Sequence, residues 1–295
     1  DIKNKDKVFY FTTCGWMMWN WLVGSLSAGA TILLFDGFPM YQKDDLLFEF
    51  ASEEKATLFG ISAKYIDSLM NKEVIPKKNY NLSSLRTICS TGSPLSKDGF
   101  KYIYNKIKKD VHLSSISGGT DIISCFVLGN LFQPVYEGEI QNRGLGMDVD
   151  IFDEKGSPID NIKGELVCKT PFPSMPVKFW NDEGNKKYKS AYFEKYNNVW
   201  HHGDFAKITN NGGFVIFGRS DTTLNPGGVR LGTAEIYNVV EKFDEIQESI
   251  VIGQSWKNDI RIILFVVLNS GYNLSDEIKG KIKKAVRSQA SPRHV

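Results

Sequence analysis

Short runs of apolar, β-forming residues alternate with segments of helical spacing along the first part of the chain. The strand-like runs are Val8–Thr12, Ala30–Phe35, Thr57–Phe59, Leu85–Cys89 and His112–Ile116. The helical segments between them, each with apolar residues on one face, are Trp16–Leu26, Leu46–Ala51, Ala63–Met70 and Phe100–Ile107. Strands separated by helices of this length predict βαβ units and a mostly parallel sheet.

The pattern changes after about Thr120, where short strand-like runs are separated by Gly, Pro, Asn and Asp. These runs are Ile122–Leu128, Asp148–Phe152, Glu165–Lys169, Val199–His202 and Phe214–Phe217. They predict a smaller, β-rich subdomain.

A third pattern begins at Asp221. Two strand-like runs, Ile250–Gly253 and Ile260–Leu268, lie between helical segments at Thr233–Lys242 and Leu274–Gln289. The predicted fold class is therefore α/β, with a large N-terminal domain of mostly parallel sheets flanked by helices and carrying the β-rich subdomain. A smaller α+β C-terminal domain follows, so we expect domains at residues 1–220 and 221–295.

Composition is that of a folded globular chain. Hydrophobic residues make up 42% and charged residues 24% of the 295 residues, which excludes a wholly disordered chain, a collagen and a coiled coil. Lysine plus arginine number 36 against 34 aspartate plus glutamate, a formal charge of +2. Charge therefore gives no reason to expect a nucleic acid or an anionic membrane as partner.

The cysteines and the apolar stretches of the sequence indicate in which cellular compartment the protein is expected. Cys14, Cys89, Cys125 and Cys168 form no C-x-x-C pair and are too sparse for a disulfide scaffold. We therefore expect free thiols and a reducing, cytoplasmic location. The most apolar stretch, Trp16–Leu34, is interrupted by polar residues and glycines, so no membrane span is expected. The charged start of the chain does not fit a signal peptide.

Several common catalytic signatures are absent from the sequence. There is no P-loop and no G-x-S-x-G elbow, and Gly144-Leu145-Gly146 lacks the third glycine of a dinucleotide fingerprint. Gly203-Asp204-Phe205 has the residues of a kinase D-F-G in the wrong order. His201 and His202 are neighbours on a predicted strand and face opposite ways, so a shared metal is not expected there.

Two segments rich in small residues follow predicted strands. Ser90–Leu95 places a Gly-Ser-Pro turn at the carboxyl end of a parallel strand, where α/β sheets bind ligands. The alternative is an ordinary turn in which Ser93 or Ser96 caps the next helix. Ser117–Asp121 contains two glycines that free the backbone to wrap a ligand, and its aspartate offers an oxygen suited to Mg²⁺. Its alternative is a glycine turn whose aspartate bonds its own backbone.

Two further segments carry charged side chains. His201–Asp204 is expected at the end of a strand, where Asp204 could accept both hydroxyls of a ribose. The alternative is a simple turn aspartate. Gly218–Gly232 is long and glycine-rich, and its two arginines could hydrogen-bond ribose or phosphate.

Taken in this order, the four segments resemble the acyl-adenylate-forming ligases, which include the acyl-CoA synthetases, over essentially the whole chain. Gly218–Gly232 is the most specific segment, followed by Gly164–Lys169. Phe11–Trp21, Ser115–Cys125 and Gly232–Tyr237 narrow the resemblance to the enzymes that act on acetoacetate. Such enzymes form an acyl-AMP from carboxylate and MgATP, release pyrophosphate, and transfer the acyl group to CoA. The resemblance thus implies acetoacetate, ATP and CoA as small-molecule substrates and Mg²⁺ as cofactor.

The resemblance also implies roles for individual residues. Gly92, Ser93 and Pro94 would line the adenine. Gly119 would lie in the nucleotide site, and Thr120 would contact the α-phosphate.

Charged residues would hold the rest of the nucleotide. Asp121 stands where the family more often has glutamate, the Mg²⁺ ligand. It is one methylene shorter, so it would reach the metal through a water. Asp204 and Arg219 would hold the ribose hydroxyls, and Arg230 would lie near phosphate.

Three positions would govern the acyl group and CoA. Gly228 would sit at the CoA entrance, and Asp221 would be the hinge about which the C-terminal domain rotates. Gly118 lacks a side chain where acetate-using relatives carry tryptophan, which implies an acyl pocket wide enough for a four-carbon keto acid. Under this hypothesis Gly118→Trp shifts the preference toward acetate.

Two features of the family are missing from the sequence. Neither a phosphate loop of the kind T-S-G-T-T-G-x-P-K nor the S-G-K segment with the adenylating lysine occurs. The chain is therefore expected to be a central fragment, as the missing initiator methionine also indicates. Two alternatives stay open: another short-chain acyl-CoA synthetase, for acetate or propionate, and a non-catalytic nucleotide-binding module.

Overall fold

The computed structural model describes residues 2–220, 223–224, 231–256 and 259–295. Residues 1–202 and 207–216 form one compact unit, and residues 203–206 and 217–295 form a second. The division predicted after residue 220 stays a prediction, and each unit is described by itself.

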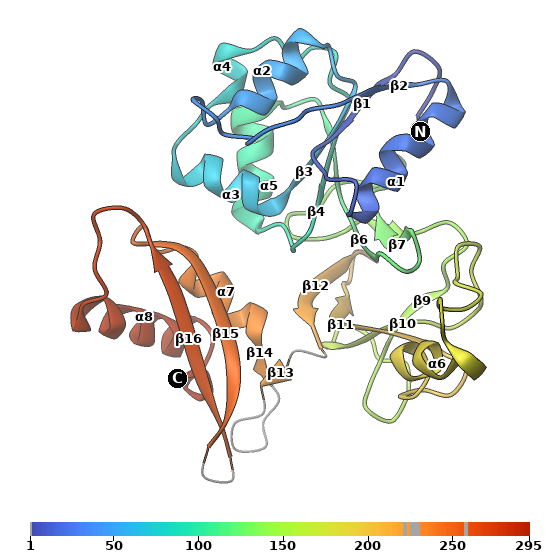
Figure 1. The fold of residues 1–295 in the computed structure, drawn as a ribbon, viewed down its shortest axis with the longest axis vertical. Helices are drawn as coiled ribbons and strands as arrows, with labels where there is room; N and C mark the ends of the chain where they lie inside the picture. The colour runs from blue at the N-terminus through green and yellow to red at the C-terminus, as the bar shows by residue number, and fades with distance from the viewer. Residues whose placement is uncertain (1, 221–222, 225–230, 257–258) are drawn as a thin grey trace. The chain divides into compact units, whose positions relative to one another are not determined.

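The α/β class expected from the sequence is confirmed. The first unit is built on a five-stranded sheet of order β2-β1-β3-β4-β5, in which all neighbouring strands are parallel (Figure 1). Its strands are β1 (Lys7–Tyr10), β2 (Thr31–Leu33), β3 (Leu58–Ser62), β4 (Thr87–Thr91) and β5 (His112–Ser115). The winding direction reverses between β1 and β3, and in open sheets ligands bind at the carboxyl ends beside such a switch point.

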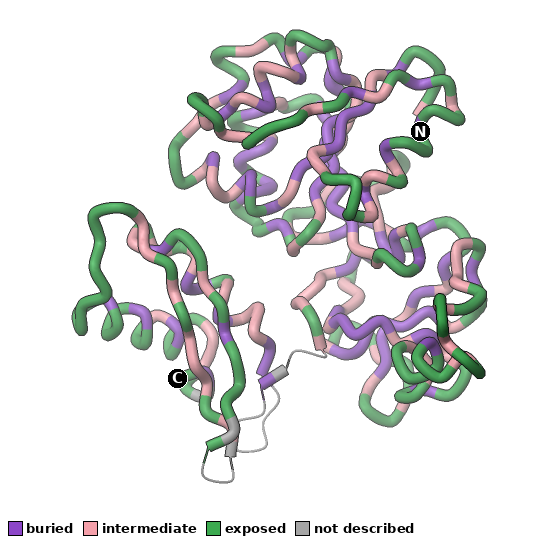
Figure 2. The backbone as a smooth tube through the Cα atoms, viewed as in Figure 1, coloured by how far each residue is buried: buried purple, intermediate pink, exposed green. Residues whose placement is uncertain are grey.

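Helices cover both faces of this sheet (Figure 1). They are α1 (Met17–Gly24) with η1 (Ser25–Ala28) on one face, and α2 (Leu46–Glu53), α3 (Ala63–Asn71), α4 (Pro76–Asn79) and α5 (Lys97–Tyr102), continued by the π-helix η2 (Ile103–Ile107), on the other. Alternate residues of β1 serve the two cores: Phe9 stacks on Phe59, while Val8 and Tyr10 cluster with Leu22 of α1. Both faces of β1 are buried, which explains why its apolar run does not alternate with polar residues. Figure 2 shows this buried backbone in purple.

The β-rich subdomain is also confirmed. It contains the antiparallel sheet β6-β7-β8 and the four-stranded sheet β12-β11-β10-β9. The strands are β6 (Ser117–Gly119), β7 (Ser124–Leu128), β8 (Asn142–Arg143), β9 (Val149–Phe152), β10 (Gly164–Cys168), β11 (Trp200–Ile208) and β12 (Phe214–Arg219). Two helical elements that the sequence did not predict precede β11, namely η3 (Glu183–Asn185) and α6 (Lys186–Tyr192).

Several expected strand boundaries differ from those observed, and in three instructive cases strand pairing overrides the local pattern. The fourth strand covers Thr87–Thr91 rather than Leu85–Cys89, since its residues pair in register with Leu58–Ser62. Ser117–Gly119, for which a glycine turn was the alternative, is a strand, because it pairs with β7. His201–Asp204 does not end a strand, since β11 runs on to Ile208.

The second unit has its own core. Its elements are β13 (Thr223–Leu224), β14 (Leu231–Gly232), α7 (Thr233–Val240), β15 (Ile246–Trp256), β16 (Asp259–Leu268), α8 (Asp276–Gln289) and η5 (Pro292–His294). Ile278, Ile282 and Val286 bury the apolar face expected for α8 against Val240 of α7. Ser275 begins this helix by accepting a hydrogen bond from the backbone N–H of Ile278.

Within the described ranges, no helix is long and apolar enough to cross a membrane. All four cysteines carry free thiols, as expected, with Cys14 exposed and the other three buried. Burial raises the pKa of the Cys89 thiol to about 12.

A charged contact holds the amino end of β1. Asp6 is buried, and its Oδ1 accepts from Arg86 Nη2 at 2.5 Å while Oδ2 accepts from the Lys3 backbone N–H at 2.8 Å. Burial raises the pKa of the Asp6 carboxyl, but these hydrogen bonds and the charge of Arg86 outweigh it, so the pKa lies below its ordinary value.

We expect Asp6→Asn to lower the melting temperature at neutral pH and to matter less in acid. Because the folded pKa is depressed, the ionised carboxylate stabilises the fold above its unfolded pKa of about 3.9, and this contribution is lost as the pH falls through the folded pKa. Thermal unfolding of both proteins across this range measures the difference. Asp98→Asn, at a side chain 72% exposed, is the matched control with little expected effect. A difference that stays constant with pH would contradict the assignment.

Candidate functional site

The Gly-Ser-Pro turn lies at the carboxyl edge of the parallel sheet, between β4 and α5. Gly92 has φ +87°, a left-handed conformation that only glycine adopts without strain. A Cβ placed on it would lie 4.0 Å from the Cβ of Ser62, at the end of the neighbouring strand β3. The turn therefore presents its backbone beside the end of β3.

Ser93 and Pro94 complete this turn, and the structure settles which serine caps the helix that follows. Ser96 Oγ accepts the backbone N–H of Gly99 at 3.1 Å, so Ser96 is the N-cap of α5. The capping alternative is thus confirmed for Ser96, and Ser93 is left within the turn.

Gly118 and Gly119 lie in β6 at positions with no room for a side chain. A Cβ on Gly118 would lie 2.1 Å from the backbone oxygen of Ser124 and 2.6 Å from Cα of Cys125. A Cβ on Gly119 would lie 2.8 Å from Cε1 of His202. Both glycines therefore permit a close approach, one to strand β7 and the other to an imidazole ring.

This geometry corrects the expected outcome of Gly118→Trp. The Cβ direction at Gly118 leads into the backbone of β7, so a tryptophan would displace that strand. Gly118→Trp is therefore expected to disturb the pairing of β6 with β7, which a shift in preference alone would not require. A place for Gly118 in an acyl pocket remains a prediction.

His202 fills the space beside Gly119. It is 7% exposed, its Nε2 lies 3.1 Å from the carbonyl oxygen of Gly118, and its ring packs edge-on against Phe126 with centroids 4.8 Å apart. His201 points the other way on the same strand, where its Nε2 lies 2.9 Å from Oε2 of the buried Glu165. The opposite orientation expected for the two histidines is confirmed.

Thr120 and Asp121 form the exposed turn between β6 and β7. The Asp121 carboxylate accepts a hydrogen bond from the hydroxyl of Tyr192, which lies in α6. The Tyr192 ring stacks on Trp200 with centroids 3.7 Å apart and an interplanar angle of 15°. The sequence offered no signal for this partner, because Tyr192 stands 71 positions after Asp121 in an unpredicted helix.

Asp204 and Arg219, assigned by resemblance to the same ribose, meet in the second unit. Asp204 is 7% exposed, and its Oδ1 lies 3.4 Å from Arg219 Nη1. The Ser220 N–H donates to the Gly203 carbonyl at 2.7 Å. A buried carboxylate needs such a partner, since an unpaired charge is costly away from water.

Three predicted site residues, Asp221, Gly228 and Arg230, lie outside the described residues. In the part of the chain that the structure describes, no three His, Cys, Asp or Glu side chains gather as a metal site.

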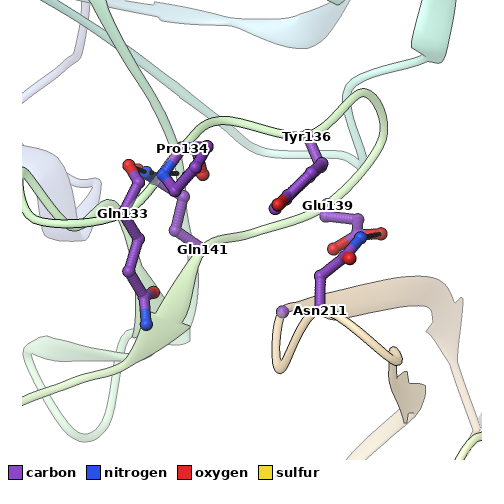
Figure 3. Close-up of a pocket in the computed structure, with 7 residues that line it drawn as sticks. Gln133, Pro134, Tyr136, Glu139, Gln141 and Asn211 are labelled. Carbon is purple, nitrogen blue, oxygen red and sulfur yellow. Dashed lines mark hydrogen bonds between the residues drawn. The ribbon is translucent and has the colours of Figure 1, made fainter.

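A separate pocket of about 200 Å³ lies in the first unit (Figure 3). It is lined by Gln133, Pro134, Tyr136, Glu139, Gln141, Asn211 and Gly213. Its carboxylate is already engaged, since Glu139 accepts from the side chains of Thr209 and Asn211. None of the predicted site residues that the structure describes lines this pocket.

The fold and these segments fit a class of AMP-binding enzymes: residues 1–175 match the family described as AMP-binding enzyme, and the chain belongs to that family. Among individual proteins, it is 55% identical over 294 residues to the acetoacetyl-coenzyme A synthetase of Rhizobium meliloti (strain 1021), covering 100% of this chain and 45% of that protein. It is 46% identical over 297 residues to the acetoacetyl-CoA synthetase of Gallus gallus, covering 100% and 44%.

A solved structure agrees. The acetoacetyl-CoA synthetase from Streptomyces lividans superposes with a TM-score of 0.90 at 43% identity, over 100% of this chain and 45% of that one. The resemblance drawn from the motifs is confirmed. The chain spans less than half the length of these relatives.

We expect Gly118→Ala to destabilise the first unit, because the added methyl group would overlap backbone atoms of β7 that cannot move aside cheaply. Gly24→Ala is the matched control, since nothing lies within 4 Å of a Cβ at that helical position. There we expect no loss, or a gain of about 0.5–1 kcal/mol. Chemical denaturation measures both variants. Equal stability of the two would show that β6 can accept a side chain at Gly118.

Proposed function

We propose that the protein carrying this chain is an acetoacetate–CoA ligase. The observation that carries the proposal is the 55% identity, across the whole chain, to a protein named acetoacetyl-coenzyme A synthetase. The Gly-Ser-Pro turn at the carboxyl edge of the parallel sheet supports it, because such an edge is where α/β folds bind nucleotides.

The proposed reaction has two steps. An acetoacetate carboxylate oxygen attacks the α-phosphorus of ATP, pyrophosphate leaves, and acetoacetyl-AMP forms. The sulfur of CoA then attacks the acyl carbon, the thiol proton is lost to solvent, and AMP leaves. Neither step needs a protein nucleophile, so positioning and charge neutralisation dominate catalysis.

In the first step, the turn at Gly92, Ser93 and Pro94 would line the adenine and the Thr120 hydroxyl would contact the α-phosphate. The buried Asp204 and Arg219 would hold the ribose hydroxyls. Their separation of 3.4 Å supports a shared site, since both oxygens of a carboxylate can accept more than one hydrogen bond.

Asp121 fits a role as Mg²⁺ ligand. Mg²⁺ prefers oxygen ligands, keeps several waters, and binds through one or two carboxylates together with substrate phosphates. One exposed carboxylate, next in sequence to Thr120, suits such a site, and the hydroxyl of Tyr192 donates a hydrogen bond to it. The ion, when bound, would neutralise charge on the phosphates.

In the second step, Gly228 would border the CoA entrance and Asp221 would act as the hinge between domains 1–220 and 221–295. Gly118 would lie by the acyl group, with Gly119 beside the nucleotide. We also propose that the partners are small molecules and that no nucleic acid is bound. We propose a cytoplasmic location as well, because free thiols are typical of a reducing compartment.

A pyrophosphate-release assay on the full-length protein tests the proposal. Acetate, acetoacetate and butyrate are compared at equal concentration with ATP and CoA. Release that is fastest with acetoacetate supports the ligase, whereas a preference for acetate favours another short-chain synthetase. No release with any acid favours the non-catalytic module.

We expect Asp204→Ala to raise the KM for ATP by roughly 10- to 150-fold, because hydrogen bonds to a charged acceptor are worth about 1.5–3 kcal/mol. Steady-state kinetics with varied ATP measure the change, and circular dichroism checks the fold. Glu183→Ala removes an exposed carboxylate and is the control. An unchanged KM in a folded Asp204→Ala protein would rule out the ribose contact.

A further inference from the structure

The side chain of His202 contacts the Gly118–Asp121 segment at Gly118 and Gly119. Its ring contacts both Gly119 and Phe126. A Cβ placed on Gly119 would lie 2.8 Å from Cε1 of His202, and the centroids of the His202 and Phe126 rings are 4.8 Å apart. The ring is 7% exposed, so it is held in place by packing. The ring of His202 fits only because Gly119 has no side chain, since a side chain at position 119 would collide with the ring.

The hydrogen bond to Gly118 fixes where the ring carries its proton. A carbonyl oxygen can only accept, so at 3.1 Å the Nε2 of His202 must be the donor. The bond joins residues 84 positions apart and ties β11 to β6, two residues before Thr120.

The other end of the segment is held independently. Tyr192 donates to Asp121, and its ring stacks on Trp200, two residues before His202 on β11. The segment is thus held at Gly118 by an imidazole and at Asp121 by a phenol. Thr120 lies between these two hydrogen-bonded residues.

We propose that His202 is a positioning residue for the nucleotide site, which sets the place of Thr120 and Asp121 through the Gly118 carbonyl and the space beside Gly119. The proposal rests on the proposed function, because it takes those two residues as contacts for ATP.

The test compares two substitutions at this position in the full-length protein. His202→Gln keeps an N–H donor at the distance of Nε2, whereas His202→Leu keeps similar bulk without a donor. We expect His202→Leu to raise the KM for ATP about tenfold, the effect of losing one buried hydrogen bond. The KM for CoA should not change, and His202→Gln should stay within about threefold of the wild type.

A matched control separates positioning from general damage. His112→Leu removes a histidine that is hydrogen-bonded to Gln141 at the opposite, amino edge of the parallel sheet. If the role of His202 were only structural, both leucine variants would lower the amount of active enzyme and leave the KM for ATP alone.

A second measurement does not depend on catalysis. Hydrogen–deuterium exchange should be faster in peptides covering residues 117–124 of His202→Leu, and unchanged there in His202→Gln and His112→Leu. In addition, Gly119→Ala should lower the melting temperature more in the presence of His202 than in a His202→Ser background, where the ring it strikes is gone.

The outcomes distinguish the two proposals. If the wild type releases no pyrophosphate with acetoacetate, the proposed function fails, and exchange over residues 117–124 still decides whether His202 positions the segment. If His202→Leu shows wild-type KM and exchange, or if His202→Gln is equally impaired, the positioning role is overturned.

Discussion

Burying both faces of five parallel strands is the constraint on which the first unit depends. Parallel neighbours cannot be joined by tight hairpins, so each connection crosses over a face of the sheet as helix and loop. Residues of β1 consequently alternate between two apolar cores, with Phe9 in one and Val8 in the other. Because all strands run the same way, the turns that leave β3, β4 and β5 meet at one edge. For this reason Ser62 and Gly92 are neighbours there, although they are 30 positions apart in the sequence.

In the β-rich part of the unit, side chains hold the β6–β7 hairpin through contacts that the local sequence pattern does not predict. Strand β11 brings Trp200 and His202 beneath the β6–β7 hairpin, and α6 adds Tyr192. A phenol then holds the Asp121 carboxylate, while an imidazole holds the Gly118 carbonyl. Aromatic rings suit this task, since they lose little conformational freedom and bury a large area around a single polar contact.

Charge is treated differently in the two units. The carboxylate of Glu165 is almost fully buried, and Lys195 and His201 both contact it. These two side chains supply the partners that a buried charge needs within the protein. The Asp204 carboxylate in the second unit has Arg219, whose side chain is 47% exposed. An arginine at the surface can keep its charge hydrated while it pairs with a buried carboxylate.

The sequence by itself determined the α/β class, most helices and strands of the parallel-sheet region, the β-rich region and the small-residue segments, because periodicity and turn chemistry are local properties. It did not determine that Ser117–Gly119 is a strand, that β11 continues through Asp204, or that α6 forms. Nor could it show that Tyr192 meets Asp121, or that the missing side chain of Gly118 makes room for β7. Those features depend on which segments, 70 or more positions apart in some cases, come to lie side by side. Only the packed tertiary structure decides that, since the direction in which a side chain points has meaning only once its neighbour is in place.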